Sequence, residues 1–212
     1  NLGSAIWAAL ALSIIFFTIR TRGVGRTEAW CCGLLTAFAP LFTVHAVTME
    51  VYASAGCIIA LAVEVSLRYL ERNDIRYLMT LAVIFGIGGL GHHPLLRLVG
   101  LSFAFFILPK SGLRRGLIAF SVALGSGLLT IVFLPIRSGT LPNRDWGAPR
   151  SFERLTDHIM GQRIRDSYSE NMWQFDTDSL VEFFMQLVQS SPALLLLGLT
   201  GLFLFRAALF TR

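Results

Sequence analysis

Polar side chains that could do chemistry are confined to three short stretches of an otherwise apolar chain. The first holds a histidine, a carboxylate and a phenol; the second holds two adjacent histidines; the third combines arginine, aspartate, tryptophan and histidine. These candidate site residues are His45, Glu50 and Tyr52; His92 and His93; and Arg137, Asp145, Trp146 and His158. Arginine and histidine bind phosphate, and a carboxylate can accept a proton from a hydroxyl. The set therefore suits a site for an anionic ligand.

Simpler roles compete with these for single residues. Glu50 is expected at the start of a helix, where the helix dipole favours a carboxylate, so it is either a cap, a cation ligand or a general base. The side chains of His92 and His93 would point about 100° apart on a helix and do not easily chelate one ion. Hydrogen bonding to an anion is favoured for this pair. The sequence points to no particular cofactor, although a divalent cation stays open.

The third stretch changes character at Ser151. Three prolines between residues 135 and 149 predict a loop with a Trp-Gly turn. Ser151 is a good helix N-cap with Glu153 in the first turn. A short amphipathic helix should follow, with Phe152 on its apolar face and His158 on a cationic face free for phosphate. The alternative is a helix that only caps the bundle.

The composition of the chain indicates an integral membrane protein. Its 212 residues are 54% hydrophobic and 15% charged, with a mean hydropathy of +0.64. Soluble domains carry roughly 25% charged residues. The net charge of +5 comes from cations scattered between apolar runs, which argues against nucleic-acid binding and for membrane topology. The bilayer is therefore the first expected partner.

Apolar runs predict an all-α bundle of about seven membrane helices, since a span needs roughly 20 apolar residues. The runs are 3–19, 29–46, 50–67, 77–91, 94–109, 115–136 and about 183–205. Pro40 is expected to kink the second helix. We divide the chain into a bundle of six helices at 1–136, a long loop with the amphipathic helix at 137–180, and a final helix at 181–212.

Two local interactions are expected within this bundle. Glu64 and Arg68 are four residues apart on one helix and should either pair or extend toward the membrane surface. Gly86, Gly88 and Gly89, together with Gly91, remove side chains from one side of the fourth helix and should let another backbone approach closely.

The distribution of cations orients the chain by the positive-inside rule. Eleven cations follow the first, third, fifth and seventh predicted helices, whereas the two short connections opposite hold only Arg97. The first side is therefore expected to be cytoplasmic. All four histidines and the long loop then lie on the extracytoplasmic side, which is the expected active face.

The segment LPIRSGTLPNRDWGAPRSFERLTDHIMGQ at 134–162 resembles the protein O-mannosyltransferase-like membrane family, long filed as a domain of unknown function in the GT-C glycosyltransferase superfamily. The likeness rests on Leu-Pro-x-Arg ending at Arg137, on Asp-Trp-Gly-x-Pro from Asp145 and on His158. MEVYAS at 49–54, GLGHHP at 89–94 and the opening NLGSAIWAALAL agree in order along the chain.

This resemblance implies a multi-pass enzyme, expected in a bacterial inner membrane. It would transfer a sugar, mannose by analogy, from a polyprenyl-phosphate donor to an extracytoplasmic acceptor, either protein hydroxyls or a glycan. Glu50 and Tyr52 would line the cavity. His92, His93, Arg137 and His158 would contact phosphate or sugar.

The resemblance also implies a missing part. In GT-C enzymes the catalytic acid usually lies in the loop after the first helix, and this sequence is expected to begin after that loop. The catalytic Asp is then upstream of residue 1, and Glu50 is a weak substitute. A lipid-linked-sugar transporter or flippase, a membrane scaffold subunit, or a haem protein with facing His45 and His92 remain alternatives.

Overall fold

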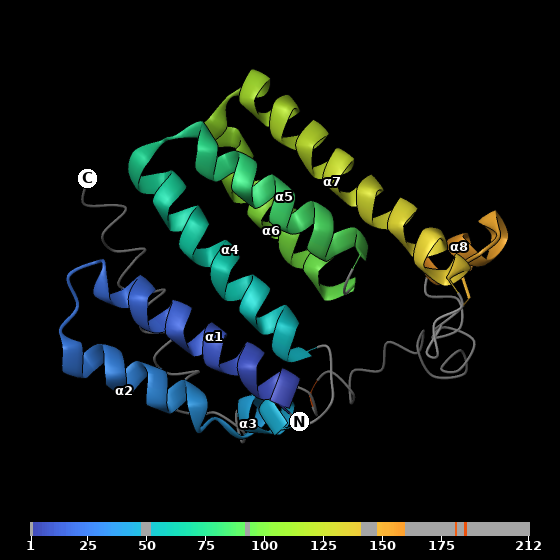
Figure 1. The fold of residues 1–212 in the computed structure, drawn as a ribbon. Coiled ribbons are helices and arrows are strands. Elements are labelled where there is room, and N and C mark those ends of the chain that lie inside the picture. Colours follow the sequence, from blue (N-terminus) through green and yellow to red (C-terminus); the bar gives the residue numbers. More distant parts are fainter. Residues whose placement is uncertain are drawn as a thin grey trace. The chain divides into compact units, whose positions relative to one another are not determined.

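The computed structural model describes residues 2–47, 52–91, 94–140 and 148–159, with the single residues 181 and 185. All regular secondary structure in these ranges is helical, which confirms the predicted all-α class (Figure 1). The chain divides into two compact units. Unit 1 comprises Asn1–Ala53 and Met172–Arg212, and unit 2 comprises Ser54–Asn171. Each unit is described by itself.

Unit 1 contains α1 (Leu2–Arg20), α2 (Arg26–Ala37) and α3 (Pro40–Val47). α1 packs against both α2 and α3. The rings of Phe16 on α1 and Trp30 on α2 lie with centroids 5.0 Å apart. The two helices can turn back on each other tightly because Gly23 adopts a φ of 83°, in the left-handed region that glycine enters at little cost.

Pro40 breaks the second predicted helix rather than kinking it. α2 ends at Ala37 and α3 begins at Pro40, so the range 29–46 is two helices. Proline has no N–H, and its ring disfavours helical backbone at the residue before it, so the chain restarts with proline in the first helical position. The hydroxyl of Thr43 donates a hydrogen bond to the Ala37 carbonyl at 2.8 Å across the break.

Unit 2 contains most of α4 (Tyr52–Arg72), together with α5 (Ile75–Gly91), α6 (Pro94–Ser111) and α7 (Leu113–Gly139). α5 packs against α6 and α7, and α4 contributes side chains to the same core (Figure 1). Their shared core is a cluster of buried apolar side chains. Its members are Ala62, Val65, Tyr69, Leu78, Leu81, Ala82, Ile107 and Ala119.

Glycine lets α5 and α7 pack closely, as the sequence predicts. A Cβ atom at Gly86 would overlap the Ser126 hydroxyl and the Ala123 carbonyl of α7. At Gly88 it would lie 3.1 Å from a side-chain carbon of Leu96 on α6. Small residues at such crossings bring helix backbones close enough for extensive van der Waals contact, which drives helix association in membranes.

The α4–α5 and α6–α7 turns lie at the same end of unit 2. The guanidinium of Arg115, at the start of α7, donates hydrogen bonds to the Asn73 side-chain carbonyl at 3.1 Å and to its backbone carbonyl at 3.4 Å. Asn73 adopts a φ of 51° and Gly112 a φ of 77°, as tight reversals require. Since α5 and α7 both start at this end, they run parallel.

Two helix boundaries differ from the prediction. α4 continues to Arg72 rather than ending near residue 67, and α7 continues to Gly139 with Pro135 inside it. Pro135 was expected both inside the helix 115–136 and at the start of a loop, and of these two expectations the loop was wrong at this residue. Proline removes one backbone donor, and adding residues to an existing helix is far easier than nucleating a new one. Prolines are also more frequent in membrane helices than in soluble ones.

Three of the described helices are long and apolar enough to cross a membrane: α1, α4 and α7. The apolar part of α5, Ile75–Gly89, is shorter. The seventh predicted helix at 183–205 lies outside the described residues apart from Met185, so the figure of about seven spans stays a prediction. The polytopic helical membrane architecture is confirmed by these apolar helices.

Candidate functional site

The C-terminal end of α7 presents Arg137 in its last turn. The Arg137 carbonyl accepts hydrogen bonds from the backbone N–H of Thr140 at 3.1 Å and from its hydroxyl at 2.7 Å. These bonds terminate the helix, since the last carbonyls of any helix need partners from outside the helical ladder. The Arg137 side chain itself is exposed, so its charge is available to a ligand.

The chain then returns to the end of α7 through residues 148–151. Pro149 is buried, and Ala148 adopts a φ of 42°, an uncommon conformation for a residue with a Cβ. This return places Arg150 beside α7, where its Nε donates a hydrogen bond to the Ser138 hydroxyl at 3.3 Å. The serine is 1% exposed, so the Arg150 guanidinium is held against a buried polar group.

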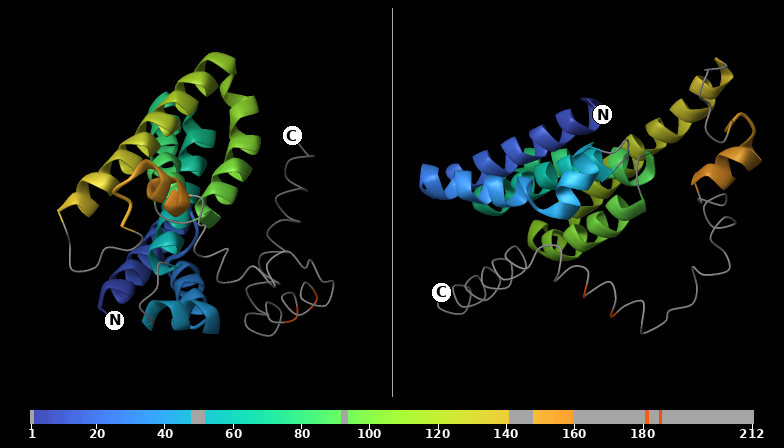
Figure 2. Two further views of the ribbon diagram at one scale, coloured as in Figure 1. Left: turned by 90° about the vertical axis from the view of Figure 1, so that its right-hand side faces the viewer. Right: turned by 90° about the horizontal axis from the view of Figure 1, so that it is seen from below.

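α8 (Phe152–Ile159) follows directly, as predicted. Ser151 caps it: its hydroxyl accepts a hydrogen bond from the Arg154 backbone N–H at 3.3 Å. Glu153 occupies the first turn, where a negative charge is favoured. Phe152 is 85% exposed, which suits an apolar face that meets lipid. α8 lies next to the end of α7 in both views (Figures 1 and 2).

The structure thus gathers three arginines at one end of unit 2. Arg137 comes from α7, Arg150 from the return segment and Arg154 from α8, and all three are exposed. The described residues 137–140 and 148–159 hold two carboxylates, Glu153 and Asp157. An excess of guanidinium groups at a helix end can bind a phosphate through paired, charge-assisted hydrogen bonds. We call these three residues the arginine cluster.

Of the other predicted site residues, some lie on described helices and some lie outside the described ranges. Tyr52 is the first residue of α4 and is exposed. His45 belongs to α3 in unit 1, and His158 to α8 beside the arginine cluster. The predictions for Glu50, His92, His93, Asp145 and Trp146 lie outside the described residues. The convergence of all four histidines on one face therefore stays a prediction.

Topology nevertheless relates the C-terminal end of α5 to the end of α7 that carries the arginine cluster. α5 and α7 are parallel, and Gly86 lies against Ala123 and Ser126. The C-terminal ends of both helices therefore point to the same end of unit 2. α7 extends beyond Gly91, the last residue of α5, by roughly 9–14 Å before Arg137 is reached, at 1.5 Å per residue.

Arg150 and Ser138 were not among the residues singled out from the sequence. The sequence feature that could have identified Arg150 is its place directly after Pro149, in the same stretch as the predicted site residues Arg137 and Asp145. Their pairing spans twelve residues, and no periodicity in the sequence predicts such a contact. Among the side chains that the structure describes, no three histidine, cysteine or acidic groups come together as a metal site.

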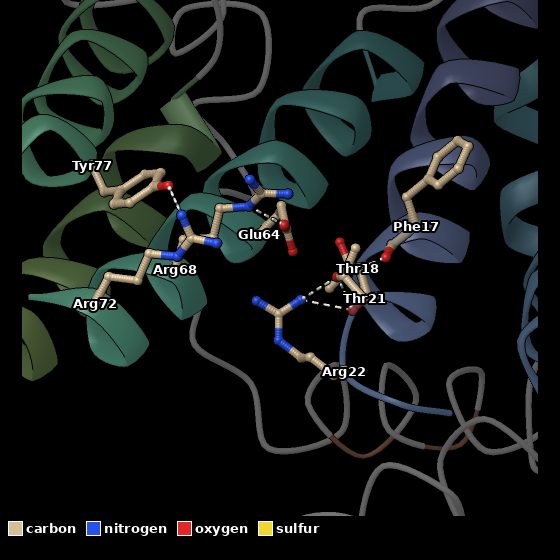
Figure 3. Close-up of polar contacts among 8 residues, drawn as sticks. All are labelled: Phe17, Thr18, Thr21, Arg22, Glu64, Arg68, Arg72 and Tyr77. Atoms are coloured by element: carbon tan, nitrogen blue, oxygen red, sulfur yellow. Dashed lines mark hydrogen bonds and ion pairs between the residues drawn. The ribbon is translucent and has the colours of Figure 1, made fainter. Parts of the chain in front are cut away.

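Figure 3 shows the polar contacts within each unit. On α4, the predicted pair forms: Arg68 Nε donates to Glu64 Oε1. Arg72 also donates to the Tyr77 hydroxyl at 3.3 Å. At the end of α1, Arg22 donates to the Thr18 carbonyl at 2.7 Å. Of the two outcomes expected for Glu64 and Arg68, pairing is the one that the structure shows.

Comparison with known proteins supplies the family. The sequence profile of the dolichyl-phosphate-mannose-protein mannosyltransferases matches residues 1–138, more than half of the chain. The match includes the positions of the predicted site residues up to Arg137, whereas Asp145, Trp146 and His158 lie beyond it. No curated protein and no solved structure matches the chain significantly. The chain therefore belongs to the dolichyl-phosphate-mannose-protein mannosyltransferase family, a family of integral membrane glycosyltransferases of the GT-C type.

Proposed function

We propose that this protein transfers mannose from a polyprenyl-phosphate-linked donor to hydroxyl groups of an extracytoplasmic acceptor protein. The observation that carries the proposal is the family match over residues 1–138. The arginine cluster supports it, because a lipid phosphate is the leaving group of such a donor and guanidinium groups bind phosphate in a bidentate manner.

The proposed reaction is a single displacement at the anomeric carbon. The acceptor hydroxyl oxygen forms a bond to this carbon while the bond from the carbon to the phosphate oxygen breaks. The electron pair of that bond leaves with the polyprenyl phosphate, and the hydroxyl proton passes to a carboxylate base. Charge grows on the leaving phosphate during this step, so fixed cations beside it lower the barrier.

The predicted site residues divide between these tasks. We assign Arg137 and His158, with Arg150 beside them, to the leaving phosphate, and His92 and His93 to phosphate or sugar contacts. Glu50 is the candidate base within this chain. His45, Tyr52, Asp145 and Trp146 are proposed to line the substrate cavity.

The proposed active face is extracytoplasmic, in a bacterial inner membrane. Its support is the positive-inside pattern: Arg72, Arg76, Lys110, Arg114 and Arg115 flank the two turns at one end of unit 2. The arginine cluster lies at the opposite end, because α7 runs from one end to the other. If the cation-rich turns are cytoplasmic, the cluster faces outward.

The test is a transfer assay on the full-length protein in nanodiscs. Radiolabelled polyprenyl-phosphate mannose is supplied with extracytoplasmic proteins, and label is counted in precipitated protein. We expect label in protein, and we expect it to fall when Arg137 is changed to alanine but not when Arg76, at the other end of unit 2, is changed. Tight binding of the lipid without transfer of any polyprenyl-phosphate sugar would support a transporter or a scaffold instead.

A further inference from the structure

An apolar groove runs along unit 2 between α5, α6 and α7. Its volume is about 430 Å³, within the roughly 300–1,000 Å³ that is typical of ligand sites. Every side chain lining it is apolar, and the lining includes glycines at 86, 89 and 100. Leu78, Ile107, Leu108 and Phe120 line the part of the groove nearest the two turns.

Cations stand at that end of the groove. Lys110 follows Leu108 by two residues on α6, and Arg114 and Arg115 begin α7 one turn before Ala119 and Phe120. The α6–α7 turn is tight, since a Cβ atom at Gly116 would lie 3.5 Å from a Leu108 methyl group. The three charges therefore lie within about one helical turn of lining residues at the adjoining ends of α6 and α7.

These charges are not neutralised by acidic neighbours in the described part of the chain. The Arg115 guanidinium bonds to the neutral amide of Asn73. Lys110 and Arg114 are exposed, and within the described ranges neither forms an ion pair with a carboxylate. The nearby carboxylate of Asp74 accepts a hydrogen bond from the Arg76 backbone N–H at 2.9 Å, which holds it at the start of α5.

We propose that the groove binds an anionic diacyl phospholipid, with one acyl chain between α5, α6 and α7 and the phosphate beside Lys110, Arg114 and Arg115. The apolar lining suits a hydrocarbon chain and offers no partner to a polar ligand. The three cations suit a phosphate whose net charge is not cancelled by a choline or ethanolamine group. Basic pockets between membrane helices recognise anionic headgroups in this way.

The inference does not depend on the transferase activity, because this end of unit 2 is opposite the arginine cluster. It would bind a lipid of the leaflet that the cation distribution assigns to the cytoplasm, whereas the proposed donor phosphate lies at the other end. The bound lipid would fill the space between α6 and α7 and so hold the helix carrying Arg137.

The experiment uses the full-length protein in phosphatidylcholine nanodiscs containing a small fraction of phosphatidylglycerol with a diazirine in one acyl chain. After irradiation, labelled peptides are mapped by mass spectrometry. We expect label on peptides between residues 78 and 124, displaced by unlabelled phosphatidylglycerol and not by phosphatidylcholine.

Paired variants separate the two parts of the site. Lys110→Gln with Arg114→Gln should lower labelling roughly tenfold or more, because each cation near anionic lipid contributes about a factor of five. The charge-conserving pair Lys110→Arg with Arg114→Lys should keep it. Ala104→Phe, which fills the groove, should block labelling, whereas Leu117→Phe, which does not line it, should leave labelling unchanged.

Three results would overturn the proposal. Equal labelling by phosphatidylcholine and phosphatidylglycerol probes would show general lipid contact. Displacement by polyprenyl phosphate at concentrations where phosphatidylglycerol fails would assign the groove to the sugar donor. No label in the groove, with the fold intact by circular dichroism, would show that another protein surface covers it.

Discussion

The Nε of Arg150 donates a hydrogen bond to the hydroxyl of Ser138, and this contact ties the entrance of α8 to the last turn of α7. It sets the position of α8 and of the residues that α8 carries, including His158. The two residues are twelve positions apart along the chain. The contact therefore acts as a brace for the arginine cluster.

Removing the acceptor should loosen this brace without unfolding unit 2. Ser138→Ala loses a hydrogen bond of 3.3 Å to a charged group, which we expect to cost about 1 kcal/mol because the bond is long. Mannose transfer should fall as well. We expect the KM for the donor to rise clearly while the apparent Tm changes by only a few degrees. The matched control is Ser121→Ala, since Ser121 bonds only to the Leu117 carbonyl of its own helix. Equal effects of both changes on KM would contradict a bracing role.

Loss of a phosphate contact should slow transfer. Arg137→Ala is expected to reduce kcat/KM about tenfold to a hundredfold, as a hydrogen bond to a charged group contributes roughly 1.5–3 kcal/mol. Its side chain is exposed, so the helical circular-dichroism signal should not change. His158→Ala should lower transfer in the same direction. Wild-type rates in both variants would remove these residues from the site.

The close approach of α5 and α7 makes Gly86 intolerant of a side chain. Gly86→Ala should lower stability by about 1–3 kcal/mol, because the added methyl group meets the α7 backbone at Ala123. Gly125→Ala on α7 is the control: a Cβ atom there meets nothing within 4 Å. That change should be neutral or slightly stabilising, since alanine favours helix. The Tm values of the two variants would be measured in detergent by circular dichroism at 222 nm. Equal Tm values would disprove the close packing.

The Glu64–Arg68 pair should contribute a modest coupling energy. The Glu64 side chain is 12% exposed and the Arg68 side chain 39% exposed, so solvent screens the pair and we expect roughly 1 kcal/mol. A double-mutant cycle with Glu64→Gln and Arg68→Gln measures it. Glu64→Gln should leave transfer rates unchanged in a protein that stays folded. A large loss of kcat with unchanged stability would instead give Glu64 a role in the reaction.

Much of unit 2 could be predicted from its sequence because local patterns decide it. Apolar runs predict α5, α6 and α7 to within a few residues at most ends. The spacing of Glu64 and Arg68 predicts their pairing, and Ser151 followed by an apolar-periodic segment predicts α8. These features depend on residues three or four positions apart, which a helix necessarily brings together.

Two kinds of feature were missed. In one, helix continuation competes with helix breaking at a proline; in the other, the contacting residues are far apart along the chain. Pro40 ends one helix while Pro135 is absorbed by another, and the two prolines differ only in how much helix precedes and follows them. The bonds from Arg150 to Ser138 and from Arg115 to Asn73 cross turns, and the second spans 42 residues. The groove arises from three helices together, so no single segment predicts it.

α7 carries arginines near both of its ends, and the distance between them can be compared with the thickness of a bilayer. Arg115 and Arg137 are separated by 22 residues, or about 33 Å of helix at 1.5 Å per residue. The hydrocarbon core of a bilayer is about 30 Å thick. A thicker membrane would draw one of these charges into hydrocarbon or force α7 to become more upright, at a cost set by hydrophobic mismatch. With α7 across the bilayer, membrane thickness would set how far Arg137 stands above the acyl chains.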